Sequence, residues 1–265
     1  MARFEHASSR RAISPLDSQR MADAYDRLLA SVGRVAPEVG DGRLTSHWPL
    51  VGSHFDHGVL VVGQAVYGWL PDRTALDATS SAGRAAILAD TKASFSELDD
   101  PMSWIAGHRV ENSPFWRTAH EVTDALVPDP ESPWFSRVAW ANLYPIAPGA
   151  YKGNPEGTLR QVQTTPAAEF LTAVVNALAP RLVLVLAGPF IWPFVEPLDL
   201  GDLARADAPF TLVGTRRAGV PWICGMHPGG AQRRGWPARR YAELIVAEAA
   251  KLGVLPRAES EGSYG

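Results

Sequence analysis

The stretch 59-VLVVGQAVYGW-69 decides the fold of this chain. Its apolar run ends at Gly63 without alternating with polar residues, which is typical of a parallel strand covered by helices on both faces. Two similar runs follow in 137-RVAWANLYPI-146 and 181-RLVLVLAG-188, and two shorter strands are expected within 210-FTLVGTRRAGVPWICGMHP-228. We therefore predict an α/β fold with three α/β/α layers and a mainly parallel central sheet.

Helical periodicity separates these strands and supplies the crossovers that a parallel sheet needs. The expected helices span 17–32, 81–98, 114–126, 166–178 and 237–253. Pro166 stands where the first turn of a helix accepts a proline. We expect a single domain over 1–265, with mobile ends at 1–15 and 255–265.

Composition narrows the class of protein. The chain has 265 residues, of which 46% are hydrophobic and 20% charged, enough for one full core. It contains no apolar run long enough to cross a membrane and no apolar region of a signal peptide, so we expect a cytoplasmic protein without a membrane partner. Its one cysteine, Cys224, cannot form an internal disulfide or supply the four thiolates of an iron–sulfur cluster.

Charge limits the kind of partner. A net charge of -3 gives no overall attraction to nucleic acid, so a DNA contact requires a local basic patch. The segment 233-RRGWPARR-240 has four arginines in eight residues. It fits a DNA-binding surface and a solvated start of a helix equally well.

Suggestive side chains follow the ends of three predicted strands. Tyr67 and Trp69 offer aromatic faces, the Asn142 amide can donate and accept, and His227 can polarise or protonate an oxygen. Each alone is as compatible with a turn, a cap or a structural role. Because carboxyl ends of parallel strands share one edge of a sheet, their convergence favours a ligand site there.

These motifs resemble those of the uracil-DNA glycosylase superfamily. The resemblance spans about 55–250 and rests on 63-GQAVY-67, Asn142, 182-LVLVLAG-188 and 227-HPG-229, with 115-FWR-117 similar to a helix of the family. It implies a DNA partner, a base flipped out of the duplex, and no metal or other cofactor. Asn142 would bond the flipped base, and His227 would stabilise charge on the leaving base. The implied base-binding residues are Gln64, Ala65, Tyr67, Trp69 and Asn142.

The resemblance also assigns DNA contacts and raises a question about the acid. The loop 229-GGAQRRGW-236 would press into the DNA where the base has left, and the implied DNA-binding residues are Gly229, Gly230, Gln232, Arg233, Arg234 and Arg239. Ala65 stands where many members of the family have a catalytic aspartate. Asp77 in 76-LDATSSAGR-84 is the first candidate for the acid and Asp72 the second.

The implied activity is that of a monofunctional DNA glycosylase, in repair or in defence against phage DNA, and a monomer is the expected state. The implied substrate is a damaged or modified pyrimidine, either uracil or a 5-substituted cytosine such as glucosylated hydroxymethylcytosine. Gly68 leaves space beside the base, which favours a modified pyrimidine over plain uracil. Two alternatives stay open. One is a catalytically inactive DNA-binding protein of the same fold, and the other is a small-molecule nucleoside hydrolase.

Overall fold

The computed structural model describes residues 13–39, 42–65, 73–107, 113–149, 154–215 and 219–255. Tyr67, Trp69 and Asp72 lie outside these residues, as do most of the two ends that we expected to be mobile. The first helix, α1 (Pro15–Gly33), begins directly after Ser14, whose side chain accepts a hydrogen bond from the Asp17 N–H at 3.1 Å. A serine in this position satisfies one of the free N–H groups of the first turn.

A seven-stranded sheet with the order β2-β5-β3-β7-β10-β9-β8 forms the centre of the molecule. Its strands are β2 (Leu50–Val51), β3 (Val59–Ala65), β5 (Val138–Tyr144), β7 (Leu182–Leu186), β8 (Ala204–Arg205), β9 (Phe210–Thr215) and β10 (Pro221–Gly225). The neighbours β5, β3, β7 and β10 run parallel, whereas β2, β9 and β8 pair antiparallel. The α/β class is confirmed, and the sheet is mixed, with its parallel strands at the centre.

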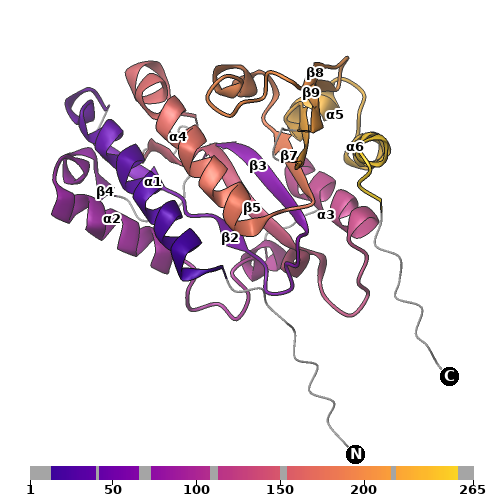
Figure 1. The fold of residues 1–265 in the computed structure, drawn as a ribbon, viewed down its shortest axis with the longest axis horizontal. Coiled ribbons are helices and arrows are strands. Elements are labelled where there is room, and N and C mark those ends of the chain that lie inside the picture. The colour runs from indigo at the N-terminus through magenta and orange to yellow at the C-terminus, as the bar shows by residue number, and fades with distance from the viewer. Residues whose placement is uncertain are drawn as a thin grey trace, which may run out of the picture.

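Helices cover both faces of this sheet (Figure 1). The remaining α-helices are α2 (Ser81–Ala93), α3 (Pro114–Leu126), α4 (Gly157–Leu178), α5 (Pro228–Arg233) and α6 (Ala238–Lys251). Helices α1 and α4 pack together on one face, and α3 and α6 pack together on the other. No helix in the described ranges has the length and apolar character needed to cross a membrane.

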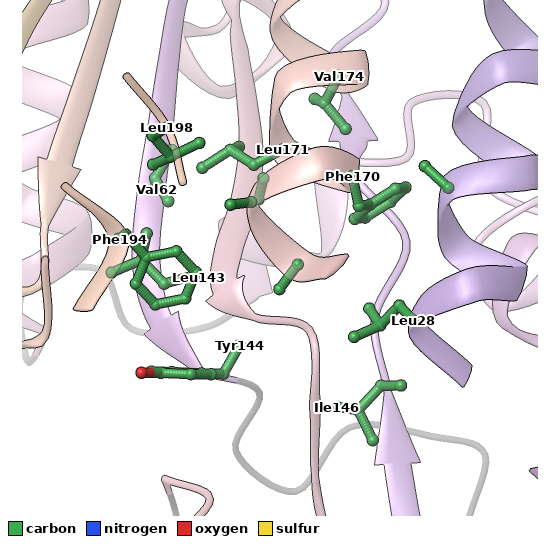
Figure 2. Packing of buried hydrophobic residues seen from close by; sticks show 14 of the residues in the cluster. Leu28, Val62, Leu143, Tyr144, Ile146, Phe170, Leu171, Val174, Phe194 and Leu198 are labelled. Atoms are coloured by element: carbon green, nitrogen blue, oxygen red, sulfur yellow. The ribbon is translucent and has the colours of Figure 1, made fainter. Parts of the chain in front are cut away.

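Successive side chains of a strand point alternately to the two helical layers. Leu60 and Val62 of β3 join the apolar cluster under α1 and α4, whereas Val59 and Val61 join the cluster under α3 and α6. Figure 2 shows the first cluster, in which Phe170 and Val174 of α4 face the sheet. The apolar residues of β3 are therefore buried on both faces of the sheet, which explains its continuous apolar sequence.

The predicted strand 137–146 is in fact two strands, because Pro145 interrupts it. Proline has no N–H for the ladder, and its carbonyl instead accepts from the His47 N–H at 2.9 Å. The chain then enters a second, three-stranded sheet with the order β4-β1-β6. Its strands are β1 (Arg43–Ser46), β4 (Arg73–Thr74) and β6 (Ile146–Pro148).

The prediction for Pro166 was wrong. Helix α4 begins nine residues earlier, at Gly157, so that Pro166 lies inside it. The buried side chain of Gln163 donates to the backbone oxygens of Leu159 and Ile146, both at 3.1 Å, and ties the extra turns to β6. Tertiary contacts of this kind outweigh the hydrogen bond that a proline removes.

Short 3₁₀ helices complete the described chain. They are η1 (Ala36–Glu38), η2 (Ala75–Thr79), η3 (Ser103–Gly107), η5 (Trp134–Arg137) and η6 (Gly188–Phe194). Of these, η6 follows the carboxyl end of β7, and η3 contributes Trp104 and Ile105 to the layer under α3.

Candidate functional site

Asn142 is the most unusual polar side chain at the carboxyl edge of the sheet. It is 3% exposed, and neither its Oδ1 nor its Nδ2 has a hydrogen-bond partner among the described residues. Leaving a buried polar group unpaired costs roughly 1–3 kcal/mol, so native chains rarely tolerate it without a role. Within the described ranges, the donor and the acceptor of this amide are therefore both unoccupied.

Gly63 makes room for this amide. It pairs with Asn142 in the β3–β5 ladder, and a Cβ at position 63 would lie 2.6 Å from Asn142 Oδ1 and 3.5 Å from Trp140 Nε1. The absence of a side chain at position 63 therefore provides the space that the Asn142 side chain occupies.

An aromatic wall stands on the same face of the sheet. It consists of Trp104, Phe115, Trp116 and Trp140. The three indole centroids lie 5.2–5.7 Å from one another, which is within the preferred range for aromatic pairs. The tryptophans come from η3, α3 and β5, so the wall forms only in the folded chain. The sequence offered a partial signal, because 115-FWR-117 is aromatic at a helix start.

His227 lies at the far end of this wall. Its ring is nearly parallel to that of Phe115, with centroids 6.0 Å apart and planes at 25°. It follows β10 as the N-cap of α5, where its Nδ1 accepts from the Gly229 N–H at 3.2 Å. A neutral imidazole that accepts at Nδ1 carries its proton on Nε2, as assigned from this bond.

Two causes lower the pKa of His227. The larger is desolvation by surrounding protein, and the smaller is the positive charge of Arg233. The ring therefore stays neutral at pH 7, with Nε2–H as a donor. Tyr241 positions this segment, because its hydroxyl donates to the Met226 carbonyl at 3.0 Å and occupies the space that a side chain at Gly225 would need.

Helix α5 replaces the loop that we expected at 229–236. Pro228 occupies its first turn, a position that proline favours. Gln232, Arg233 and Arg234 are exposed, and a Cβ at Gly229 or Gly230 would make only ordinary contacts. Arg239 lies on α6, where it forms an exposed ion pair with Glu243 at 3.3 Å.

Gln64 and Ala65 lie at the end of β3. The Gln64 amide donates to the Ala187 carbonyl at 3.0 Å and accepts from Asn154 Nδ2 at 3.3 Å, so it joins the ends of β3 and β7 to residue 154. Ala65 is half-buried and packs beside the cluster under α1 and α4. Both residues therefore support the edge of the sheet in this structure.

Asp77 has a local structural partner. It lies in η2, where its Oδ2 accepts from the Thr74 N–H and its own N–H donates to Thr74 Oγ1, both at 3.3 Å. This reciprocal pair is a capping box. Within the described ranges, no carboxylate hydrogen-bonds to Asn142 or His227, and no group of three His, Cys, Asp or Glu side chains is arranged to hold a metal ion.

His47 is a site residue that the sequence did not reveal. It lies between β1 and β2, is 3% exposed, and has no partner for either ring nitrogen within the described chain. Its ring packs on Trp140 with centroids 4.3 Å apart. Burial lowers its pKa from 6.5 to about 3, so the imidazole is neutral.

Comparisons with known proteins do not assign the chain to a family. No protein-family profile matches the chain, and a search of curated protein sequences finds no significant match. The fold and site by themselves define an α/β protein with an aromatic and polar site at the carboxyl edge of its parallel strands, which is where open α/β sheets bind ligands.

Proposed function

We propose that this chain is a monofunctional DNA glycosylase with the fold of the uracil-DNA glycosylase superfamily, and that it releases a flipped, damaged or modified pyrimidine. The observation that carries the proposal is the buried amide of Asn142 beside Gly63, which has no hydrogen-bond partner among the described residues. An amide with a free donor and a free acceptor suits the edge of a nucleobase, which presents both kinds of group. The aromatic wall beside it suits a planar ring.

His227 would act on the leaving base. Water attacks C1′ of the deoxyribose, the N-glycosidic bond breaks, and the bond electrons leave with the base as an anion. The proton that the water loses neutralises this anion, so the products are an abasic site and the free base. The neutral imidazole, with its proton on Nε2, is a donor for the oxygen on which this charge develops. Removing one such donor costs roughly 3–4 kcal/mol of transition-state stabilisation in other enzymes.

The exposed surface after His227 supports a DNA partner. Arg233 and Arg234 supply positive charge next to the proposed site, in a chain whose net charge is negative. Packing within the protein does not require glycine at positions 229 and 230, so their small size leaves room for a backbone of another molecule. A nucleoside hydrolase would have no use for this arrangement.

The position of Asp77 favours a second candidate function. Its carboxylate is engaged in the capping box with Thr74, and Ala65 supplies no acid. A DNA-binding protein of the same fold without glycosylase activity would look the same at these positions. For the enzyme, Asp72 becomes as important to test as Asp77, by Asp72→Asn and Asp77→Asn.

The test uses DNA duplexes carrying uracil, 5-hydroxymethylcytosine or its glucosylated form. Mass spectrometry of the released base and strand breakage after alkali both report base excision. The proposal predicts release from at least one duplex, and loss of that release in His227→Ala with an unchanged circular dichroism spectrum. DNA binding without release from any duplex would instead establish the inactive binder.

A further inference from the structure

His47 and Asn142 lie on the same face of the sheet, although they come from different segments. The main-chain N–H of His47 bonds to the carbonyl of Pro145, just beyond β5, while Leu50 pairs with Trp140. Side chains alternate in extended chain, and Trp48 packs on Phe170 under α4. His47 therefore points to the opposite face, where it meets Trp140.

Trp140 connects the two polar side chains. The His47 ring packs on the Trp140 ring, and Trp140 Nε1 and Asn142 Oδ1 flank the same point beside Gly63. Neither His47 nor Asn142 finds a hydrogen-bond partner elsewhere in the described residues. Two buried polar side chains that lie next to the same indole, and that have no partner among the described residues, indicate a shared ligand rather than two separate packing defects.

The chemistry of the pair restricts that participant. The Asn142 amide and a neutral imidazole each offer a donor and an acceptor. No described charged group pairs with either side chain, so a charged ligand would be buried there without compensation. The complementary ligand is neutral, and the aromatic wall requires it to be planar.

We propose that His47 is a specificity-determining residue that hydrogen-bonds the same ligand as Asn142, and that this ligand is a neutral planar heterocycle bearing both carbonyl and N–H groups. The part of this inference that concerns DNA rests on the proposed glycosylase function. The part that concerns ligand chemistry rests on the two buried side chains alone. Free bases and bases in DNA share this chemistry, and the experiment separates them.

The first experiment observes the imidazole directly. Protein labelled with ¹⁵N-histidine and ¹⁵N-asparagine is titrated with free uracil, free cytosine and benzene, and the His47 ring nitrogens and the Asn142 side-chain amide are followed by NMR. We expect uracil or cytosine to shift the His47 signals and benzene to leave them in place, while the exposed His54 provides an internal control. Binding that moves the Asn142 amide signal but not His47, or no binding of either base, would overturn the proposal.

The second experiment measures selectivity in full-length variants. His47→Phe removes both hydrogen bonds, His47→Asn retains a donor and an acceptor, and His54→Phe is the matched control. We expect His47→Phe to change the uracil-to-cytosine preference by about tenfold or more, because sites that hydrogen-bond a substrate discriminate strongly. His47→Asn should recover part of that preference, and His54→Phe none of the change. An unchanged preference in folded His47→Phe would refute the role.

The two hypotheses fail in different ways. If His47 responds to free pyrimidines but no duplex loses a base, the glycosylase function fails and the role of His47 in ligand recognition stands. If bases are excised with identical kcat, KM and base preference in the wild type and His47→Phe, the glycosylase stands and His47 has only a structural role.

Discussion

Gly63→Ala is predicted to disable the site while preserving the fold. The added Cβ would lie 2.6 Å from Asn142 Oδ1, whereas an ordinary carbon–oxygen contact is about 3.3–3.6 Å, so one of them must move by roughly 0.7 Å. The Asn142 amide has no hydrogen-bond partner within the described ranges to hold it, so it moves before the β3–β5 ladder does. Overpacking of this kind costs about 1–3 kcal/mol of the free energy of unfolding. A misplacement near 1 Å costs up to about 100-fold in rate.

The assay for Gly63→Ala combines stability with base release. The midpoint temperature of thermal unfolding should fall by roughly 2–12 °C, since each kcal/mol of lost stability lowers it by about 2–4 °C in a chain of this size. Single-turnover base release should fall about tenfold to 100-fold. Gly201→Ala is the matched control, because its Cβ would have no atom within 4 Å. A Gly63→Ala protein whose Asn142 NMR signal has moved, yet which releases base at the wild-type rate, would refute the assignment of Asn142.

Three further predictions concern pH, salt and DNA contact. The pKa of His47 is about 3 in the folded chain and near 6.5 in the unfolded chain. Between these two values only the unfolded chain takes up the proton, so the free energy of unfolding decreases as the pH is lowered. Urea unfolding at pH 6.5 and 4.5 should show about 2.3 kcal/mol more loss in wild type than in His47→Phe, and equal losses would contradict burial of a neutral imidazole. Replacing both Arg233 and Arg234 by alanine should weaken DNA binding and reduce the slope of the log binding constant against log salt concentration by about 2. An unchanged slope would show that these arginines do not contact DNA phosphates. Gly229→Ala and Gly230→Ala should keep wild-type unfolding midpoints but weaken DNA binding, and a loss of stability without a loss of binding would show that the glycines serve folding alone.

Local sequence patterns predicted several helices and strands, although not the start of α4. The helix at 114–126 was predictable from Ser113, which caps it, from Pro114 in its first turn, and from its apolar period. The strands β3 and β7 were predictable because their continuous apolar runs are buried on both faces. In each case the interactions that define the element lie within it or follow from its burial.

Long-range contacts decide what the sequence did not predict. The strands β2, β4 and β8 have two residues each, too few for any periodicity, and exist because of their pairing. His47 lies between two short strands, and only the fold packs its ring on Trp140. Asn142 could be proposed from its place near the end of a predicted strand, but its lack of a partner among the described residues is a property of the packed structure.

The central claim is that Asn142 and His227 act together on one bound base. A double-mutant cycle of Asn142→Ala and His227→Ala, measured by single-turnover base release from the best duplex substrate, tests it most directly. Residues that act as a unit are strongly non-additive, so we predict a loss of about 100-fold or more for each variant and little further loss in the double variant. Wild-type release rates in either folded single variant, or losses that simply multiply, would contradict the account.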